Sequence, residues 1–116
     1  MAEAVSLEFL KRLAHGLAEQ FGPDCEVVVH DLTREDHDNT IIAIENGHVS
    51  GRSLGDGPSR VALEAMRGGK AVDRLNYYTK SRDGRVLRSS TIFIKDEEGK
   101  PAGILAINYD VSKLLA

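Results

Sequence analysis

The sequence predicts an α+β fold: a five-stranded antiparallel sheet with helices across one face and a further helix at the N-terminus. Three observations support this prediction. The chain begins with an amphipathic segment, continues with short segments rich in β-branched residues, and joins several of these segments through tight turn signals. Its 116 residues are the usual size of one domain, so we expect residues 1–116 to form a single unit.

The N-terminal helix is predicted over residues 6–21. Apolar residues recur there at spacings of three and four, which places them on one stripe of a helix. Ser6 is a suitable N-cap, because its hydroxyl can accept a free amide of the first turn. Gly22 and Pro23 then end the helix. The stripe consists of Leu10, Leu13, Ala14, Leu17, Ala18 and Phe21.

Two strands follow, at residues 25–32 and 40–46. The first is rich in β-branched residues and is too short for a helix. A polar stretch at residues 33–39 separates it from the second, which Gly47 ends. The pair is therefore predicted to form neighbouring antiparallel strands.

A loop and a helical stretch connect these strands to the rest of the sheet. Residues 48–57 are rich in glycine, and Pro58 suits the first turn of a helix that ends at residues 68–69. This crossover is expected to lie across the sheet and roof a cavity, which would be the natural binding site.

Three strands close the fold, at residues 75–82, 86–95 and 102–109. The turn between the first two contains Asp83-Gly84, a strong hairpin signal, and residues 98–101 join the last two. These short connections predict a meander.

Composition excludes several classes of protein. The net charge is −3, so a basic face for phosphate contacts is not expected, and any DNA binding would need another domain. Cys25 is the single cysteine, which rules out an intramolecular disulfide. The N-terminus does not resemble a signal peptide, and the apolar runs are too short to cross a membrane. We therefore expect a cytoplasmic protein that does not contact membranes.

Metal binding and catalysis are not predicted. The histidine and acidic residues near His30 and His48 lack the spacing of known metal sites, and no cofactor is expected. Ser89, Ser90 and Thr91 carry hydroxyls without a Gly-x-Ser-x-Gly elbow. The sequence therefore predicts a binding protein rather than an enzyme.

Several strings resemble those of the YheO-like PAS domain, the sensory half of bacterial transcriptional regulators. They are VVHDL (28–32), IAIENGHVSGR (42–52), DG (83–84), LRSST (87–91) and GILAIN (103–108), the last followed by Asp110. The resemblance covers roughly residues 9–114. It implies a PAS core at about residues 24–110. It also implies that residues 111–116 start a linker helix toward a C-terminal helix-turn-helix DNA-binding domain absent from this chain.

The candidate ligand-binding residues are polar side chains on or beside the predicted sheet. Arg52 could hold a carboxylate through two hydrogen bonds, or it could pair with Asp56 or Glu45 at the surface. Two faces of the strand at 86–95 are possible inner faces, one with Ser89 and Thr91 and one with Ile92. The full candidate set is Arg52, Asn46, His30, Ser89, Thr91, Asn108 and Tyr78.

Structural roles remain open for the same residues. Asn46 precedes Gly47 and suits a turn, and Asn108 could hold neighbouring backbone. His30 could be an ordinary sheet histidine. Tyr77 and Tyr78 could both be packing residues, one on each face of the sheet.

The resulting hypothesis is a ligand-sensing domain that binds a small polar molecule, with amino-acid-like molecules among the candidates. The apolar stripe of the N-terminal helix and the apolar C-terminal end predict a homodimer. The alternative is a dimerisation or scaffolding module with a filled core and no ligand.

Overall fold

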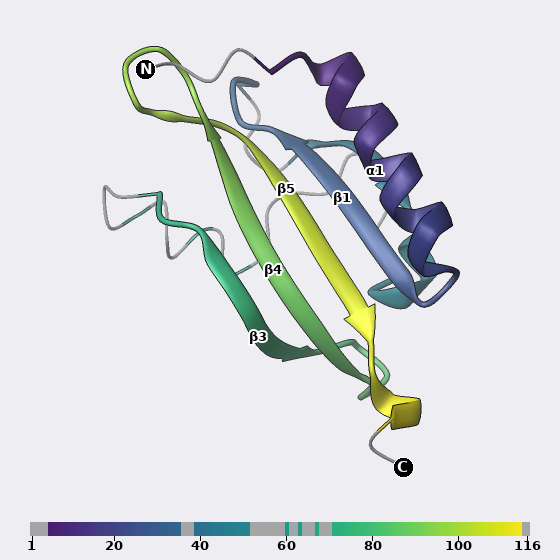
Figure 1. The fold of residues 1–116 in the computed structure, drawn as a ribbon. Coiled ribbons are helices and arrows are strands. Elements are labelled where there is room, and N and C mark those ends of the chain that lie inside the picture. The colour runs from purple at the N-terminus through teal and green to yellow at the C-terminus, as the bar shows by residue number, and fades with distance from the viewer. Residues whose placement is uncertain are drawn as a thin grey trace.

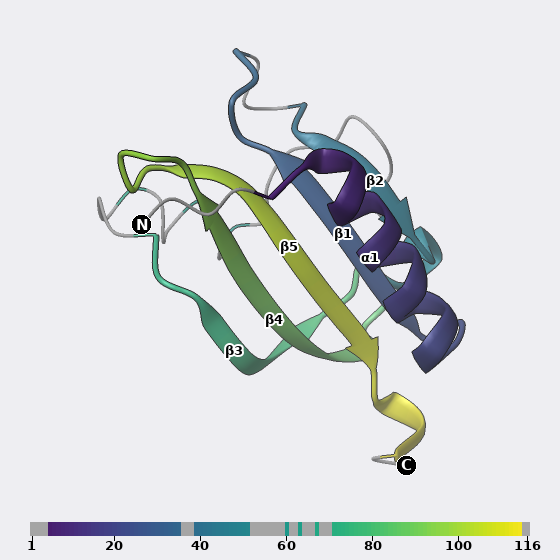
Figure 2. The same ribbon diagram turned by 45° about the horizontal axis from the view of Figure 1, so that its top comes forward.

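The computed structural model describes residues 5–35, 39–51, 60, 63, 67 and 71–114, and it confirms the predicted α+β fold. Five antiparallel strands form one sheet in the order β2-β1-β5-β4-β3 (Figures 1 and 2). The elements are α1 (Leu7–Phe21), β1 (Cys25–Asp31), β2 (Ile41–Glu45), the 3-10 turn η1 (Gly47–Val49), β3 (Arg74–Lys80), β4 (Val86–Lys95), β5 (Pro101–Asp110) and the 3-10 turn η2 (Ser112–Leu114).

Helix α1 begins and ends as its sequence predicts. The Ser6 hydroxyl accepts the backbone N–H of Phe9 at 3.1 Å, which satisfies one of the free amides of the first turn. At the other end Gly22 has a φ of 89° and donates its N–H to the carbonyl of Ala18 at 2.9 Å. This backbone conformation favours glycine and ends the helix.

Helix α1 packs along β1 on one face of the sheet, as Figure 2 shows. Three buried helix residues, Leu10, Ala14 and Ala18, are spaced four apart and therefore lie on one side of the helix. They form the first hydrophobic cluster with buried sheet residues Cys25, Val27, Val29 and Leu105.

The opposite face of the sheet carries a second, smaller cluster. It contains Leu32, Ala71, Phe93 and Ile104, with Ala106 packed against it. Successive side chains on a strand point to opposite faces, so Glu26, Val28 and His30 on β1 also face away from α1. This second face holds the polar residues described below.

The predicted strand bounds differ from the observed ones by at most two residues. The meander β3-β4-β5 is confirmed, and so is the antiparallel β1–β2 pair. Most of the predicted loop and crossover helix lies outside the described residues, namely residues 52–59, 61–62, 64–66 and 68–70. The predicted roof of a cavity falls in this part of the chain. The three described residues of that stretch, Arg60, Leu63 and Arg67, are helical.

Candidate functional site

Four of the candidate residues lie on the sheet face opposite α1. Register pairs Ser89 on β4 with Asn108 on β5, and Asn108 with Glu26 on β1. Thr91 and His30 point to this same face from β4 and β1. The face of β4 that carries Ile92 instead lies on the side of α1, since Ile92 pairs with Leu105 of the helix-facing cluster. The strand register therefore shows that the face of β4 with Ser89 and Thr91 points away from α1, and that the face with Ile92 lies on the side of α1.

A continuous row of side-chain hydrogen bonds crosses four strands on this face. Thr79 on β3 contacts the Ser89 hydroxyl at 2.9 Å, and Ser89 donates to Asn108 Oδ1 at 2.7 Å. Asn108 Nδ2 then donates to Glu26 Oε1 at 2.7 Å. We call these four residues, Thr79, Ser89, Asn108 and Glu26, the polar row.

The polar row has one direction of donation. Glu26 is an acceptor at its end, so the amide group of Asn108 turns its N–H toward Glu26 and its carbonyl toward Ser89. Because Ser89 donates its single hydroxyl hydrogen to Asn108, Thr79 is the donor in the hydrogen bond between Thr79 and Ser89. Such a chain polarises each of its members in the same sense.

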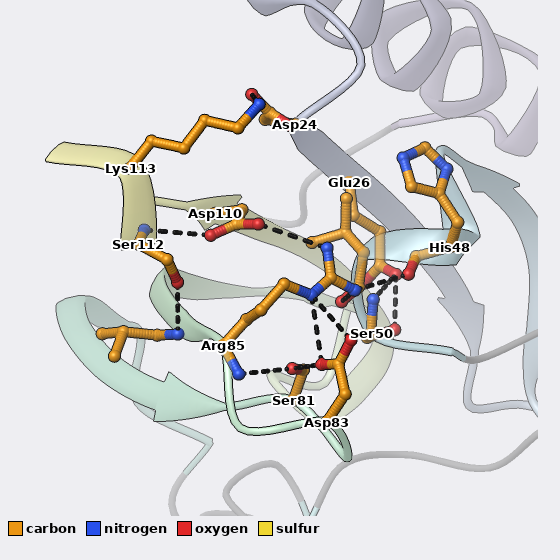
Figure 3. A network of polar contacts seen from close by, with 12 residues as sticks. Asp24, Glu26, His48, Ser50, Ser81, Asp83, Arg85, Asp110, Ser112 and Lys113 are labelled. Carbon is orange, nitrogen blue, oxygen red and sulfur yellow. Dashed lines mark hydrogen bonds and ion pairs between the residues drawn. The ribbon is translucent and has the colours of Figure 1, made fainter. Parts of the chain in front are cut away.

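Glu26 is the charged end of the row and is fully buried. The backbone N–H of Ser50 donates to Oε2 at 3.1 Å, and the Ser50 hydroxyl donates to the same oxygen (Figure 3). With the Asn108 amide, three donors offset the cost of removing this carboxylate from water. Within the described part of the chain, no lysine or arginine forms an ion pair with Glu26. Glu26 was not among the residues predicted from the sequence, although an acidic residue within a strand rich in β-branched residues was a usable signal.

A second row, one pleat further along the strands, mixes polar and small groups. The hydroxyls of Tyr77 and Thr91 lie 2.7 Å apart, and Thr91 is buried. Thr91 pairs with Ala106, which in turn pairs with Val28. The smallest side chain of this row therefore stands at the middle of the face.

Tyr78, a candidate in the sequence, lies on the other side of the sheet. It pairs with Arg88 and is 66% exposed, so Tyr77 is the tyrosine that adjoins Thr91. The reason is local. Asn76 adopts the left-handed conformation with a φ of 57°, and the β3–β4 register shifts between Arg74 and Tyr77. That bulge decides which tyrosine faces inward.

Two of the three remaining candidates, His30 and Asn46, do not belong to the polar row. His30 is buried, and its Nδ1 lies 2.8 Å from the Thr40 hydroxyl. Asn46 does not join the polar row: it adopts the left-handed conformation and donates Nδ2 to the carbonyls of Gly22 and Cys25, at 3.1 and 2.8 Å. Arg52 lies outside the described residues.

Arg85, which the sequence did not single out, joins three parts of the molecule (Figure 3). Its guanidinium donates to the carbonyls of His48 and Val49, both at 2.8 Å, and thereby holds η1. It also contacts Asp83 in the β3–β4 turn at 3.1 Å and Asp110 at the end of β5 at 3.2 Å. The planar, five-donor guanidinium suits this forked arrangement.

Asp110 in turn anchors the start of η2. Its Oδ1 accepts the backbone N–H of Ser112 at 3.0 Å, and the Ser112 hydroxyl accepts the N–H of Val86 at 2.8 Å. The hydrogen bonds from Ser112 and then from Arg85 lower the pKa of Asp110. Asp83 also has a lowered pKa, caused first by the Ser81 hydroxyl and then by Arg85. We call Arg85, Asp110 and Ser112 the exit cluster, because they surround the point where the chain leaves the sheet.

The described residues contain no group of three or more histidine, cysteine, aspartate or glutamate side chains arranged to hold a metal ion. Among the same residues, no helix has the length and apolar character needed to cross a membrane.

Burial raises the pKa of the Cys25 thiol.

Solved structures share this fold at low sequence identity. The LOV domain of the blue-light photoreceptor Aureochrome1 matches with a TM-score of 0.55 at 20% identity, covering 99% of this chain and 91% of that one. The PAS domain of the fruit-fly ELK potassium channel matches with a TM-score of 0.52 at 16% identity, covering 84% of this chain and 96% of that one.

Sequence relatives are closer. YheO of Escherichia coli, an uncharacterized protein, is 32% identical over 108 residues, which cover 90% of this chain and 44% of YheO. The transcriptional regulator DauR of Pseudomonas aeruginosa is 37% identical over 109 residues, which cover 92% of this chain and 48% of DauR. This chain thus spans somewhat less than half the length of these relatives. The family model of the YheO-like PAS domain matches residues 1–116, so the chain belongs to the YheO-like PAS domain family.

Proposed function

We propose that this PAS domain is the sensory part of a cytoplasmic bacterial transcriptional regulator that binds a small polar molecule. A relative that shares 37% identity over nearly all of this chain is a transcriptional regulator. Because the chain spans less than half of that relative, we propose that a helix-turn-helix DNA-binding domain lies outside it. The mixed charges and the net charge of −3 agree with DNA binding elsewhere.

The polar row is the single observation that carries this proposal. If the sheet face opposite α1 served stability alone, it would carry apolar side chains. Buried polar groups contribute little net stability even when they are hydrogen-bonded. Here Glu26, Asn108 and Ser89 occupy one continuous level of the sheet. Convergent polar groups within an apolar surround are typical of small-molecule sites. We therefore assign recognition rather than catalysis to this face.

The proposal includes a route from the ligand to the rest of the regulator. Ser50 contacts Glu26 directly, and the adjoining turn η1 is held by Arg85. Arg85 also contacts Asp110, beside the point where the chain leaves β5. A ligand that changes the Glu26–Ser50 contact would thus act on the exit cluster through one arginine. It shifts the regulator only if it binds one of two arrangements more tightly.

A thermal-shift screen of this domain against amino acids, amines, small carboxylates and purines tests the proposal. A ligand at about a hundredfold over its Kd stabilises the native state by roughly 2.7 kcal/mol, which moves Tm by several degrees. The shift should disappear in Ser89→Ala. The control is Gln20→Ala, which truncates an exposed polar side chain of α1 on the other side of the sheet and should keep the shift. A screen without any hit would count against a sensor.

The second candidate is a dimerisation module, and exposed apolar side chains favour it. Leu7, Phe9 and Phe21 of α1 are 43%, 50% and 52% exposed. A partner that covered these side chains would remove apolar surface from water, which favours association. We propose a homodimer through α1, compatible with either function. Analytical ultracentrifugation of the wild type and of Phe9→Ser should give a dimer and a weakened dimer, respectively. A wild-type monomer at tens of micromolar would contradict this.

A further inference from the structure

The direction of the polar row has a consequence for the chemistry of the ligand. Ser89 donates its hydroxyl hydrogen to Asn108 Oδ1, so in the contact with Thr79 it accepts the hydroxyl hydrogen of Thr79. Both hydroxyl hydrogens of the row are therefore already engaged, and the two oxygens can offer only lone pairs to a further partner. Glu26 can only accept. Apart from the second N–H of Asn108, the row is a set of hydrogen-bond acceptors.

The charge on Glu26 also bears on the chemistry of the ligand. Asp110, the other buried carboxylate near this face, is paired with Arg85 at 3.2 Å. Glu26 has no such ion pair among the described residues, and its three partners are the neutral donors of Ser50 and Asn108. A cation bound to Glu26 would add Coulombic attraction to the hydrogen bonds, which the neutral donors lack. The strongest feature of the row is thus an acceptor with a negative charge.

Ser50 is the partner of Glu26 that a ligand can replace. Its two hydrogen bonds to Oε2 come from the residue that follows the short 3-10 turn η1; Ser50 is itself half-buried, and the next residue, Gly51, is exposed. Asn108, by contrast, lies in the middle of the sheet between two strands. A carboxylate has about four lone-pair sites, and an ammonium group has three donors. An ammonium group could therefore take the place of both Ser50 donors and use the remaining site on Oε1.

The second row supplies a complementary group. Tyr77 and Thr91 share one hydrogen bond between two hydroxyls, so one of the two protons is not used in that contact. Neither hydroxyl has another partner among the described residues, and Thr91 is 3% exposed. Because Thr91 lies two residues from Ser89, this free donor is about 7 Å along the strand from the row.

We infer that the ligand carries a protonated amine, which binds Glu26 in place of Ser50, and a neutral acceptor that meets the Tyr77–Thr91 hydroxyls. This inference rests on the proposed sensory function and names the chemical class that the function left open. It also offers a route by which binding is sensed, since displacement of Ser50 changes the segment that adjoins the turn held by Arg85.

The experiment uses pairs of probes matched in size but opposite in charge, titrated into this domain by calorimetry at neutral pH. The pairs are 4-aminobutanamide with succinamate and 5-aminopentanamide with glutaramate, each of which also carries a neutral carbonyl acceptor. We expect heat of binding and a raised Tm from the amines only. In Glu26→Gln, amine affinity should fall at least tenfold, because the charged acceptor is gone. Glu97→Gln, an exposed glutamate in the β4–β5 turn, is the matched control and should bind as the wild type does.

Ser50→Ala is a second variant that tests the inference even if Glu26→Gln does not fold. Removal of the competing hydroxyl should tighten amine binding, by about fivefold for one hydrogen bond. If succinamate or glutaramate binds in preference and Ser89→Ala abolishes that binding, the sensory function stands and the cationic ligand is wrong. Amine binding that survives Glu26→Gln, or weakens in Ser50→Ala, also overturns the inference. If neither series binds and the broader screen is flat, both the inference and the sensory function fail.

Discussion

Asn108 donates its amide N–H to the buried carboxylate of Glu26 at 2.7 Å, although the two residues lie 82 positions apart in the sequence. The contact exists because β5, the last strand, inserts beside β1, the first. It closes the polar row and fixes the orientation of the Asn108 amide. One side chain thereby connects the hydroxyls of β4 and β3 to the carboxylate on β1.

Asn108→Ala should destabilise the domain through loss of this link. Glu26 would lose one donor and Ser89 its acceptor, and each buried group left unpaired costs about 1–3 kcal/mol. We expect a loss of about 2 kcal/mol or more in the free energy of unfolding, measured by urea denaturation. The control Asn39→Ala changes an exposed asparagine and should stay within about 0.5 kcal/mol of the wild type. Equal stability of the two variants would show that the row does not act as a connected unit.

Arg85→Lys should loosen the exit cluster without removing its charge. A lysine ammonium is a compact donor group and cannot reach two backbone carbonyls and two carboxylates at once. We expect faster amide hydrogen exchange at both η1 and η2, the segments that Arg85 connects. Arg82→Lys, at an exposed position of the same turn, provides the comparison. Faster exchange confined to the β3–β4 turn would mean that Arg85 holds only its own hairpin.

Two glycine substitutions should have opposite effects on stability. A Cβ at Gly103 would lie 3.1 Å from the backbone oxygen of His30 and 3.4 Å from a methyl of Ile94. Gly103→Ala should therefore cost about 1–3 kcal/mol as β1 and β5 are pushed apart. Gly16 is in the middle of α1, where a Cβ would meet nothing within 4 Å. Gly16→Ala should stabilise the domain by about 0.5–1 kcal/mol, because alanine has the higher helix propensity. Thermal unfolding measures both, and a stabilised Gly103→Ala would disprove the close approach.

The contact between α1 and β2 should depend on pH. His15 Nδ1 lies 2.6 Å from Glu45 Oε1, and the hydrogen bond and charge of Glu45 raise the pKa of His15 above its usual 6.5. Because the pKa is raised in the folded state, the contribution to stability is fully present below about pH 6.5 and is lost as the pH rises through the folded value. An NMR titration of the His15 ring should give a midpoint above 6.5, which Glu45→Gln lowers toward 6.5. A wild-type midpoint at or below 6.5 would rule out the pairing.

The sequence alone determined the elements and their order. The Ser6 cap, the four-residue spacing of Leu10, Ala14 and Ala18, and the glycine turns act over a few residues, so their signals are local. Alternation along β4 likewise predicted that Ser89 and Thr91 share a face. The family resemblance was also visible in short strings of residues, and the family model matches the whole chain.

Tertiary structure decided which of those residues meet. The insertion of β5 between β1 and β4 brings Glu26 to Asn108 and Asn108 to Ser89, and no local pattern carries that pairing. The bulge at Asn76 selected Tyr77 over Tyr78, and the left-handed backbone of Asn46 committed its amide to two carbonyls. Arg85 gained its role only when the β3–β4 turn met η1 and the end of β5. Hydrogen bonds between strands depend on register, and register is a property of the assembled sheet rather than of any one segment.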